Sequence, residues 1–321
     1  MYTHLTLDKR CQIYGLKASN FSLRSIAKEI AVNVSTVSRE LHRNSSLAGY
    51  EPYAAEIYYK KRRRNNKYPA CSWTPEIRAK VMHGLSQYYS PDQIAGYLQR
   101  RGISINHETI YQFIWQDKKA GGILHRYLRR RGKKYQKRSS NYAGRGYIPG
   151  RVDIDKRPQI VETKSRIGDW EGDTVIGADR KGAIVTLVDR CSKIALFKKV
   201  ERGTKELVTN AIVDMLKPYK TFVHTITFDN GREFSGHQTI ATMLQAKCYF
   251  AKPYHSRERG LNEHTNRLLR QFIPKKTNFK HVTNEDIAFY QNLINNRPRK
   301  ILNYKTPIEV FNSIHTVALR N

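Results

Sequence analysis

The sequence predicts a multidomain protein, with all-α N-terminal helix-turn-helix units followed by an α/β domain built on a mixed sheet. Apolar residues recur at helical spacing through roughly the first third of the chain. After about Ile160 the pattern changes to short β-rich runs separated by glycine or charged residues. Between these parts, basic residues and glycine replace apolar residues, which is typical of a linker.

The composition indicates a polyanionic partner. Lysine and arginine number 58 against 27 aspartates and glutamates, which gives a formal net charge of +31. Solubility needs far less charge, and nucleic acid is the partner that such an excess most often serves. A ribosomal or nonspecific packing protein is the alternative, although such proteins rarely carry a long ordered second half. No basic amphipathic helix favours a membrane surface.

The chain shows no sign of a membrane or secretory destination. No uncharged apolar run reaches transmembrane length, and the N-terminus lacks the apolar core of a signal peptide. The four cysteines are scattered without a C-x-x-C pair, so neither a disulfide framework nor a zinc finger is predicted. These features predict a cytoplasmic protein.

Residues 1–59 are predicted to form a helix-turn-helix DNA-binding domain. Thr6 caps a first helix that runs to Lys17, and Ser22 caps a second helix. Two buried stripes at helical spacing define the second and third helices, and they consist of Leu23, Ile26, Ala27 and Ile30, then Val34, Val37 and Leu41.

The third helix carries the candidate DNA contacts of this domain. Away from its apolar stripe lie Ser35, Thr36, Arg39, His42 and Arg43. Short polar and basic side chains at the start of a helix match the base edges and phosphates of a major groove. An ordinary three-helix bundle with a solvated face is the alternative, and charge and spacing together favour DNA binding.

Residues 60–122 are predicted to form a second helical, helix-turn-helix-like DNA-binding domain. It begins with a basic, turn-prone joint at residues 60–67. Thr74-Pro75-Glu76 and the capping box Ser90-Pro91-Asp92-Gln93 each start a helix, and Gly102 separates two apolar stripes. A purely structural bundle explains this pattern almost as well.

Residues 123–159 are predicted to be a basic linker. From His125 to Arg138 the segment carries no acidic residue. Like charges at this density repel one another, so the segment is expected to be extended and to become ordered on DNA phosphates. Its candidate DNA-binding residues are Arg129, Arg130, Arg131, Lys133 and Lys134. A solvated tether without a binding role is the alternative.

Residues 160–321 are predicted to form one α/β domain with C-terminal helices. Strands are expected at 170–176, 183–188 and 194–200, then a helix at 207–216, a half-buried strand at 222–228, a helix near 236–246, a strand at 248–251 and the helix that contains Glu263. The order βββαβαβα predicts a mixed sheet flanked by helices. Two more helices follow, one through Ile287–Ile294 and one that starts with a capping box at Thr306–Glu309.

Three acidic residues stand at comparable places on separate elements. Asp173 lies on the first strand, Asp229 at the end of the fourth, and Glu263 on the helix after the fifth. Such carboxylates suit a divalent-metal site, because hard cations prefer oxygen ligands. Each also has a structural alternative: Asp229 as the cap of an Asn-Gly turn, and Glu263 as the i, i+4 partner of Arg267. The occurrence of all three acidic residues in this order, in a strongly basic chain, favours the metal site over the structural alternatives.

The order of elements and the positions of the acidic residues resemble the RNase H-like catalytic core of polynucleotidyl transferases. Thirty-three residues separate Asp229 from Glu263, close to the spacing of DDE transposases and retroviral integrases. A more specific resemblance is to the transposases of the insertion sequence thirty family. It spans nearly the whole chain, at residues 23–41, 170–177, 228–234, 253–256, 262–263, 268–275, 296–300 and 306–307.

One position departs from the pattern of this family. The family usually has histidine before the Trp-Glu-Gly-Asp block, where this chain has Asp169. Asp169, Glu171 and Asp173 share one face of a strand, so spacing leaves all three open and the resemblance selects Asp173. Asp169 and Glu171 are expected to pair with the nearby Arg166 and Arg180.

The resemblance implies a DDE transposase, a Mg²⁺-dependent polynucleotidyl transferase. Asp173, Asp229 and Glu263 would be its catalytic residues and the ligands of two Mg²⁺ ions, for which Mn²⁺ would substitute. Family members carry a basic residue that contacts the DNA end at the position of Arg270, and Arg267 on the same helix is a further candidate.

The partner implied by the resemblance is double-stranded DNA. The enzyme would bind the terminal inverted repeats of its element, cleave the DNA and join it to target DNA by attack of a 3′-OH. Two DNA ends must meet, so a homodimer or larger assembly is expected, in the bacterial cytoplasm and on the nucleoid when DNA is bound. Two other functions stay open: a DNA-binding regulator with an inactive second half, and an RNase H-type nuclease without strand transfer.

Overall fold

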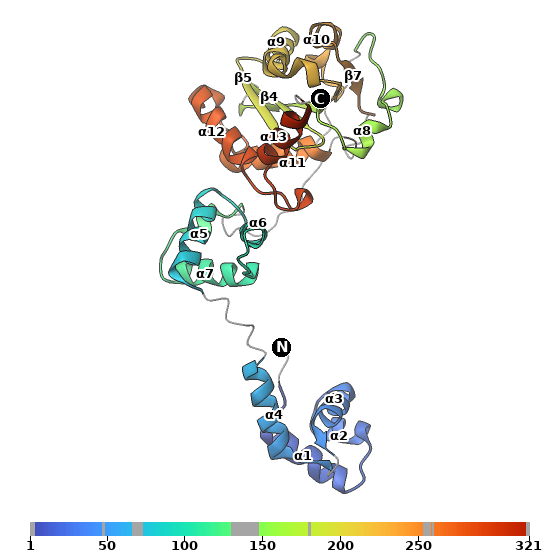
Figure 1. The fold of residues 1–321 in the computed structure, drawn as a ribbon, viewed down its shortest axis with the longest axis vertical. Helices are drawn as coiled ribbons and strands as arrows, with labels where there is room; N and C mark the ends of the chain where they lie inside the picture. The colour runs from blue at the N-terminus through green and yellow to red at the C-terminus, as the bar shows by residue number, and fades with distance from the viewer. Residues whose placement is uncertain are drawn as a thin grey trace. The chain divides into compact units, whose positions relative to one another are not determined.

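The computed structural model describes residues 4–46, 49–65, 73–129, 148–178, 181–252, 258 and 260–318. These residues belong to two compact units, unit 1 (Met1–Thr74) and unit 2 (Pro75–Asn321), which Figure 1 colours from blue to red along the chain. Each unit has a hydrophobic core of its own.

Unit 1 is a bundle of short helices. They are α1 (Leu7–Ala18), α2 (Leu23–Glu29), α3 (Val34–Asn44) and α4 (Pro52–Asn65), with a small hairpin of β1 (Ser45–Ser46) and β2 (Gly49–Tyr50) before α4. The side chains of Thr6 and Ser22 accept hydrogen bonds from the first turns of α1 and α2. Both predicted helix starts are therefore confirmed, because these caps satisfy amide donors that a helix leaves without partners.

The core of unit 1 contains a compensated charge. Arg10 on α1 is only 2% exposed. Its guanidinium donates to Glu40 on α3 at 2.8 Å, to Glu56 on α4 at 2.5 Å and to the carbonyl oxygen of Leu5 at 2.9 Å. One arginine thus joins three helices, and two carboxylates balance its charge.

Three expectations for unit 1 are wrong in detail. The predicted buried stripes include Leu23 and Val34, but these side chains are 38% and 39% exposed. Each is the first residue of its helix, so its side chain lies beyond the turns that contact the core. Residues 60–65 belong to α4 instead of a turn-prone joint, because lysine and arginine are good helix formers. Residues 66–67 of that joint lie outside the described residues.

Unit 2 begins with a helical segment. It consists of α5 (Pro75–Ser86), α6 (Pro91–Gln99), α7 (His107–Lys119) and the 3-10 helix η1 (Leu124–Tyr127). Ser90 and Gln93 form the predicted capping box at the start of α6. Asn106 caps α7 by accepting a hydrogen bond from the backbone N–H of Glu108 at 2.9 Å.

The rest of unit 2 is built on a five-stranded mixed sheet. Its strands are β3 (Asp169–Ile176), β4 (Ala183–Asp189), β5 (Ala195–Val200), β6 (Thr225–Phe228) and β7 (Lys247–Phe250), in the spatial order β5-β4-β3-β6-β7. The pairs β3–β4 and β4–β5 are antiparallel, whereas β3–β6 and β6–β7 are parallel.

The helices of this domain follow the strands in the predicted order. They are α9 (Lys205–Leu216) after β5, α10 (His237–Leu244) after β6, α11 (Gly260–Phe272) after β7, and then α12 (Asn284–Asn295) and α13 (Pro307–Ala318). The short helices are η2 (Ile154–Lys156), α8 (Ile160–Thr163), η4 (Lys217–Phe222), η5 (Arg232–Phe234), η7 (Phe279–His281) and η8 (Lys300–Leu302). The order βββαβαβα is confirmed. None of the helices described has the length and apolarity needed to cross a membrane.

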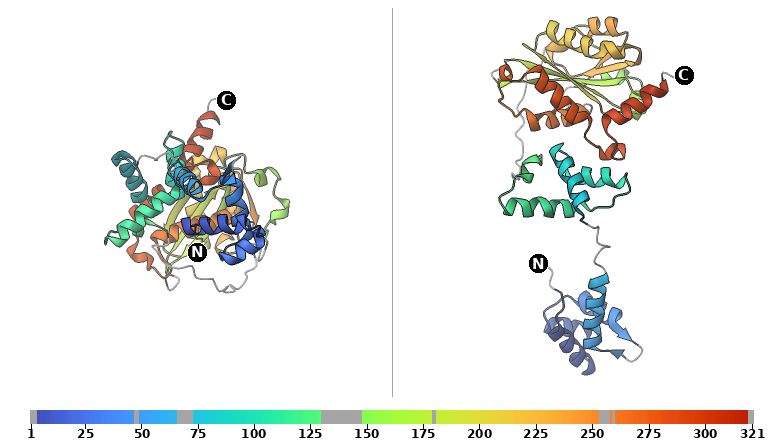
Figure 2. Two further views of the ribbon diagram at one scale, coloured as in Figure 1. Left: turned by 90° about the horizontal axis from the view of Figure 1, so that it is seen from below. Right: turned by 60° about the vertical axis from the view of Figure 1, so that its left-hand side comes forward.

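The sheet separates two hydrophobic cores. Helices α9 and α10 cover one face, and α11 and α12 cover the other, as the right-hand view of Figure 2 shows. Alternation along β4 supplies both cores, because Val185 and Leu187 pack with α9 while Ile184 and Val188 pack with α11 and α12.

Strand β6 is shorter and more buried than the sequence predicts. A half-buried strand over 222–228 is expected, but residues 217–222 form η4 and the strand begins at Thr225. Pro218 lacks the N–H that strand pairing requires, which favours the 3-10 helix. All four residues of β6 are buried, because the strand lies inside a sheet that helices cover on both faces.

The helical segment of unit 2 contacts the C-terminal part of the same unit. The hydroxyl of Tyr89 donates to the carbonyl oxygen of Asn296 at 2.7 Å. The ring of Tyr304 lies against Gly96 on α6, where a Cβ would come within 2.3 Å of it. The Tyr304 hydroxyl also donates to Asp92, at 3.3 Å from each carboxylate oxygen.

Candidate active site

The candidate active site lies on the sheet face that α11 covers. On β3, Asp169, Glu171 and Asp173 alternate with Trp170, whose side chain packs in the core on the other face. Asn266 on α11 donates its Nδ2–H to Asp173 Oδ2 at 2.9 Å, which places Asp173 under this helix. The acidic side of β3 therefore faces α11.

Asp173 and Asp229 occupy matching positions on neighbouring parallel strands. The β3–β6 register pairs Asp169 with Thr225 and Glu171 with Thr227. Continued by two residues, the same register aligns Asp173 with Asp229, the residue that directly follows β6. Neighbouring strands lie about 5 Å apart, and residues two apart share a face. The register therefore puts both aspartates on the α11 side of the sheet.

Glu263 comes to this region on the first turn of α11. It lies three residues before Asn266, the partner of Asp173, and residues with this spacing share one side of a helix. The other side of α11 is anchored in the core by Leu268 and Leu269. The Glu263 side chain is 46% exposed.

Asp229 and Glu263 both make the local contacts that the sequence leaves open as structural alternatives. Asp229 Oδ1 accepts a hydrogen bond from the N–H of Gly231 at 2.9 Å. Glu263 pairs with Arg267 at 3.0 Å. Within the part of the chain that the structure describes, no three His, Cys, Asp or Glu side chains are grouped so that they could hold a metal ion. A shared ion would have to draw Glu263 away from Arg267.

The chemistry of the donors fits a divalent cation. Asp173, Asp229 and Glu263 offer carboxylate oxygens, which hard cations prefer. Asn266 Oδ1 is buried beside Asp173 and has no hydrogen-bond partner among the described residues. An oxygen acceptor is thus left without a partner directly beside Asp173.

A further carboxylate, Glu233 on η5, lies close to Asp229. Its Oε1 accepts a hydrogen bond from the hydroxyl of Thr174 at 2.8 Å. A Cβ added to Gly231 would lie 2.5 Å from Glu233 Oε2 and 2.9 Å from Asp229 Oδ1. Glycine at position 231 therefore gives these carboxylates room to approach each other.

Glu233 and Asn266 are not among the site residues that the sequence predicts. The helical period could have found Asn266, because it lies one turn after Glu263 on the same side of α11. Glu233 lies four positions after Asp229, but it reaches the site only through the compact turn of η5, which no periodic pattern signals.

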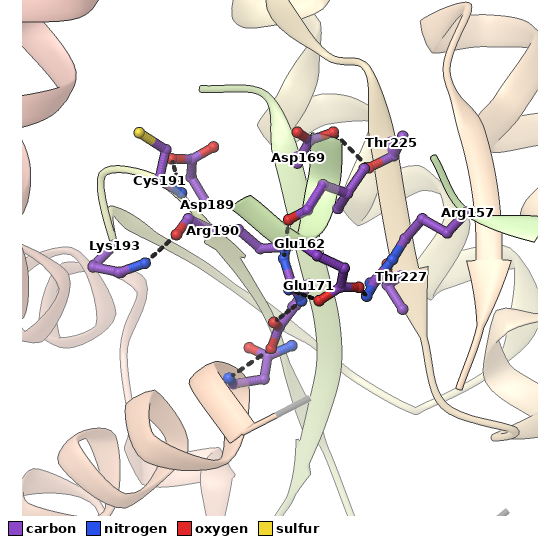
Figure 3. A network of polar contacts seen from close by, with 12 residues as sticks. Arg157, Glu162, Asp169, Glu171, Asp189, Arg190, Cys191, Lys193, Thr225 and Thr227 are labelled. Atoms are coloured by element: carbon purple, nitrogen blue, oxygen red, sulfur yellow. Dashed lines mark hydrogen bonds and ion pairs between the residues drawn. The ribbon is translucent and has the colours of Figure 1, made fainter. Parts of the chain in front are cut away.

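Asp169 and Glu171 are both buried and ion-paired. Asp169 is 1% exposed and accepts hydrogen bonds from Arg166 at 2.8 and 3.0 Å, as predicted. Glu171 is 2% exposed and pairs with Arg190 at 2.7 Å (Figure 3). Arg190 follows the end of β4, and the β3–β4 pairing brings it to Glu171. Arg180 itself lies outside the described residues.

The surroundings of Glu263 are strongly basic. The pKa of the neighbouring His264 is lowered to about 4 by desolvation and then by the positive charges of four arginines, Arg299, Arg129, Arg267 and Arg297. His264 is therefore neutral at pH 7, while the arginines around it keep their charge. This concentration of positive charge next to a candidate catalytic carboxylate suits a polyanion.

The candidate DNA contacts of unit 1 lie on the outer side of α3. Ser35, Arg39, His42 and Arg43 are exposed, and Thr36 is half-buried. Arg39 donates to the carbonyl oxygen of Ser35 at 2.9 Å and to its hydroxyl at 3.0 Å. Their contacts with DNA remain a prediction.

The candidate DNA contacts of unit 2 fall into three groups. Arg129 is exposed, and Arg130, Arg131, Lys133 and Lys134 lie outside the described residues. Arg267 is engaged with Glu263. Arg270 donates to the carbonyl oxygens of Pro274 at 3.2 Å and Ile176 at 3.0 Å, and burial lowers its pKa. Arg270 thus fastens the end of α11 to the end of β3.

Known proteins similar to this chain identify its family. Residues 1–44 match the helix-turn-helix domain family, and residues 163–256 match the integrase core domain family. The transposase for insertion sequence element IS4351 of Bacteroides fragilis is 47% identical over 98% of this chain and 97% of its own length. Transposase InsI for element IS30A of Escherichia coli K12 is 30% identical over 96% of this chain and 83% of its own. The chain belongs to the insertion sequence thirty family of transposases.

A third transposase agrees with the assignment. The transposase for element IS1086 of Cupriavidus metallidurans is 32% identical over 96% of this chain and 94% of its own. Among solved structures, the catalytic core domain of BIV integrase covers 47% of this chain and 98% of its own, with 20% identity and a TM-score of 0.38. The predicted family and the predicted fold, a helical head followed by an integrase-type mixed sheet, are confirmed.

Proposed function

We propose that this transposase binds the terminal inverted repeats of its element through α3 and catalyses metal-dependent DNA cleavage and strand transfer where β3 and β6 meet α11. The observation that carries this proposal is the parallel β3–β6 register, which, when it is continued two residues beyond its last pair, aligns Asp173 with Asp229. Helix α11 supplies the third carboxylate, Glu263. The other observations, the basic surroundings and the leftover acceptor on Asn266, support the same assignment.

Asp173, Asp229 and Glu263 would hold two Mg²⁺ ions, for which Mn²⁺ would substitute. When bound, such ions stabilise charge at the scissile phosphate and assist formation of the attacking hydroxide or alkoxide. The chain itself supplies position: β3 and β6 fix the two aspartates, and Asn266 orients Asp173. In strand transfer, the 3′ oxygen of the element end forms a bond to a target phosphorus, and the bond from that phosphorus to the target's own 3′ oxygen breaks.

DNA recognition is assigned to unit 1. The exposed polar and basic side of α3 would enter the major groove at the repeat, while the exposed arginines on and beside α11, Arg267 and Arg129, would hold the phosphates near the site of cleavage. Because both ends of the element take part in transposition, the working form would be at least a dimer on DNA.

Replacement of the three carboxylates tests the catalytic part. Asp173→Asn, Asp229→Asn and Glu263→Gln should each lower Mg²⁺-dependent strand transfer by about a thousandfold or more, because acidic groups that act as a unit fail together. Binding to a labelled inverted-repeat duplex in metal-free buffer should stay at the wild-type level. Product ends on a sequencing gel and duplex mobility shifts give the two readouts.

Asp214→Asn is the matched control for these variants. Asp214 is an exposed acid on α9, on the opposite side of the sheet, where it pairs with Lys198 at 2.6 Å. Its replacement should leave strand transfer unchanged. Repeat binding by the wild type without any product would support the DNA-binding regulator, and nicked but unjoined DNA would support the nuclease. Undiminished cleavage in all three carboxylate variants would remove the assigned site.

A further inference from the structure

A continuous set of polar contacts joins β6, β3 and α11 (Figure 3). These elements position Asp229, Asp173 and Glu263, which are termed the acidic triad. It begins on β6, where Thr227 Oγ1 accepts a hydrogen bond from Arg157 at 2.8 Å. Arg157 also pairs with Glu162 on α8, and Glu162 pairs with Arg190 at 3.1 Å. Arg190 then pairs with Glu171 on β3 at 2.7 Å. These four charged residues, Arg157, Glu162, Arg190 and Glu171, are termed the ion-pair frame.

The ion-pair frame ends on α11. Oxygen Oε2 of Glu171 accepts a hydrogen bond from the backbone N–H of Asn262 at 3.1 Å, in the first turn of the helix. Amides in the first turn have no partner within the helix, and a negative charge there is favourable. Glu171 therefore acts as a cap supplied by a strand, and it fixes the backbone immediately before Glu263.

Each end of the frame lies next to a triad residue. Thr227 lies two positions before Asp229, and Glu171 lies two positions before Asp173 on the same strand face. Asn262 directly precedes Glu263. The register that aligns the two aspartates also places Thr227 opposite Glu171. A single network thus touches all three elements at the positions that decide where their carboxylates lie.

Most of the frame is shielded from water. The side chains of Arg157, Arg190 and Glu171 are 3%, 4% and 2% exposed, and that of Glu162 is 49% exposed. Nε of Arg190 donates to the carbonyl oxygen of Val161 at 3.1 Å, so all three nitrogens of this guanidinium have partners. Buried ion pairs contribute little stability compared with apolar residues of similar size, but they fix geometry.

A second buried carboxylate on the same strand face provides a natural comparison. Asp169 is 1% exposed, pairs with Arg166 and accepts a hydrogen bond from the Thr225 hydroxyl at 2.7 Å. Like the frame, Asp169 connects β3 with β6. Among the described residues its carboxylate has these two hydrogen-bond partners and none on α11, so the link to the helix distinguishes Glu171 from Asp169.

We propose that the ion-pair frame positions Glu263 relative to Asp173 and Asp229 by fixing the first turn of α11 to β3. The inference rests on the proposed function, in which Glu263 is the third carboxylate. Glu171 and Arg190 are positioning residues, which act through Asn262 and not on the DNA. Loss of the frame should lower the affinity of Asp173, Asp229 and Glu263 for the metal ions, while the affinity of the protein for DNA stays unchanged.

Hydrogen exchange of the metal-free protein tests the frame without an activity measurement. In Glu171→Gln the amides of residues 260–264 should exchange about tenfold faster than in the wild type, because the charged cap is lost and Arg190 loses a partner. Asp169→Asn should leave the same amides unchanged. The proposal is overturned if residues 260–264 exchange equally in the wild type and Glu171→Gln, or if Asp169→Asn speeds them as much.

Strand transfer as a function of Mg²⁺ concentration gives the second readout. Glu171→Gln should need about tenfold more Mg²⁺ for half-maximal rate, as is usual when a group behind metal ligands is lost, and Mn²⁺ should restore part of the rate. Affinity for the repeat duplex should not change. A normal Mg²⁺ requirement with weakened duplex binding would assign Glu171 to DNA binding instead. If the wild type forms no joined product, the proposed function fails, while the exchange experiment still decides the frame.

Glu162→Gln keeps the test decisive if Glu171→Gln does not fold. The Glu162 side chain is half-exposed. After its replacement, Arg157 keeps its hydrogen bond to the Thr227 hydroxyl and Arg190 keeps its ion pair with Glu171. It removes the link between Arg157 and Arg190 but keeps the cap on α11. Exchange at residues 260–264 should rise by about threefold, less than in Glu171→Gln. No change in this variant, when Glu171→Gln is unfolded, overturns the frame.

Discussion

At the residue scale, the contacts of Arg39 bear on its proposed role in DNA recognition. Its guanidinium donates to the carbonyl oxygen and hydroxyl of Ser35, one turn earlier on α3. Ser35 in turn donates to Asn33, the cap of the same helix, at 2.8 Å. These contacts restrict the rotamers of a long side chain before DNA arrives, which reduces the entropy lost on binding.

Removal of the basic side chains on α3 should weaken recognition of the repeat. Arg39→Ala combined with Arg43→Ala should lower the affinity for the inverted-repeat duplex and reduce the slope of log affinity against log salt by about two, because each arginine is expected to neutralise about one phosphate. Fluorescence anisotropy titrations at several salt concentrations measure both quantities.

Lys17→Ala is the control for this change, since Lys17 is exposed on α1 and has no assigned DNA contact. It should leave both the affinity and the salt slope close to the wild-type values. Unchanged affinity in the Arg39 and Arg43 variant would transfer recognition to the helices at the start of unit 2.

At the scale of elements, α6 shows how a glycine allows two segments to pack. The ring of Tyr304 lies on Gly96, and its hydroxyl donates to Asp92 one turn earlier on the same helix. Asn303 and Tyr304 both have positive φ, at 52° and 58°, which forms the turn that presents the ring. A strained turn and a missing side chain together make this contact possible.

Gly96→Ala should therefore destabilise unit 2. Alanine normally stabilises a helix relative to glycine by about 1 kcal/mol, but here its Cβ would overlap the Tyr304 ring, and overpacking of this kind costs about 1–3 kcal/mol. Urea unfolding, followed by hydrogen exchange of peptides from unit 2, measures the change.

Gly15→Ala on α1 is the matched substitution, because no atom lies within 4 Å of the Cβ it would add. It should stabilise unit 1 by about 0.5–1 kcal/mol, the usual difference between the two residues in a helix. A stabilised Gly96→Ala protein would show that Tyr304 is free to move aside.

The elements that could be predicted from the sequence are those whose signals are local. Capping residues such as Ser22, Ser90 and Thr306 interact within three positions of themselves, so their motifs identify helix starts correctly. The partner of Glu171 could not be found in this way, because Arg190 reaches it through the pairing of β3 with β4. The strand pattern likewise fails at β6, where burial on both faces depends on the place of the strand within the sheet.

The candidate site was predictable only in part for the same reason. Period two puts Asp169, Glu171 and Asp173 on one strand face without ranking them, and the family resemblance selects Asp173. The structure adds what separates them: two are buried in ion pairs, whereas Asp173 contacts Asn266 on α11. That distinction depends on contacts between residues far apart in the sequence.

At the scale of the whole molecule, the two units rest on separate cores, and Arg10 is the critical buried charge of unit 1. Arg10→Met should destabilise unit 1 by about 3–5 kcal/mol, because Glu40 would remain buried without its ion-pair partner and Glu56 would be left with the exposed Lys60. Such a loss is comparable with the whole stability of a small domain, so repeat binding should be lost as well.

Hydrogen exchange resolved by peptide measures this effect in the full chain. Peptides from residues 7–44 should lose protection, whereas those from β4 should keep it. Arg39→Ala is the control for stability, since Arg39 is exposed and its loss should leave protection in both units unchanged. Equal loss of protection in β4 and in unit 1 would contradict the independence of the two cores.

The parallel pairing of β3 with β6 also bears on the synthesis of the protein. Parallel strands cannot be joined by a tight turn, and here β4, β5 and α9 lie between them in the chain. The two aspartates can therefore meet only after this intervening segment has left the ribosome and folded, and Glu263 follows later still. Unit 1 is complete long before that point. Under the proposed function, a growing chain would hold DNA before it is able to cut it.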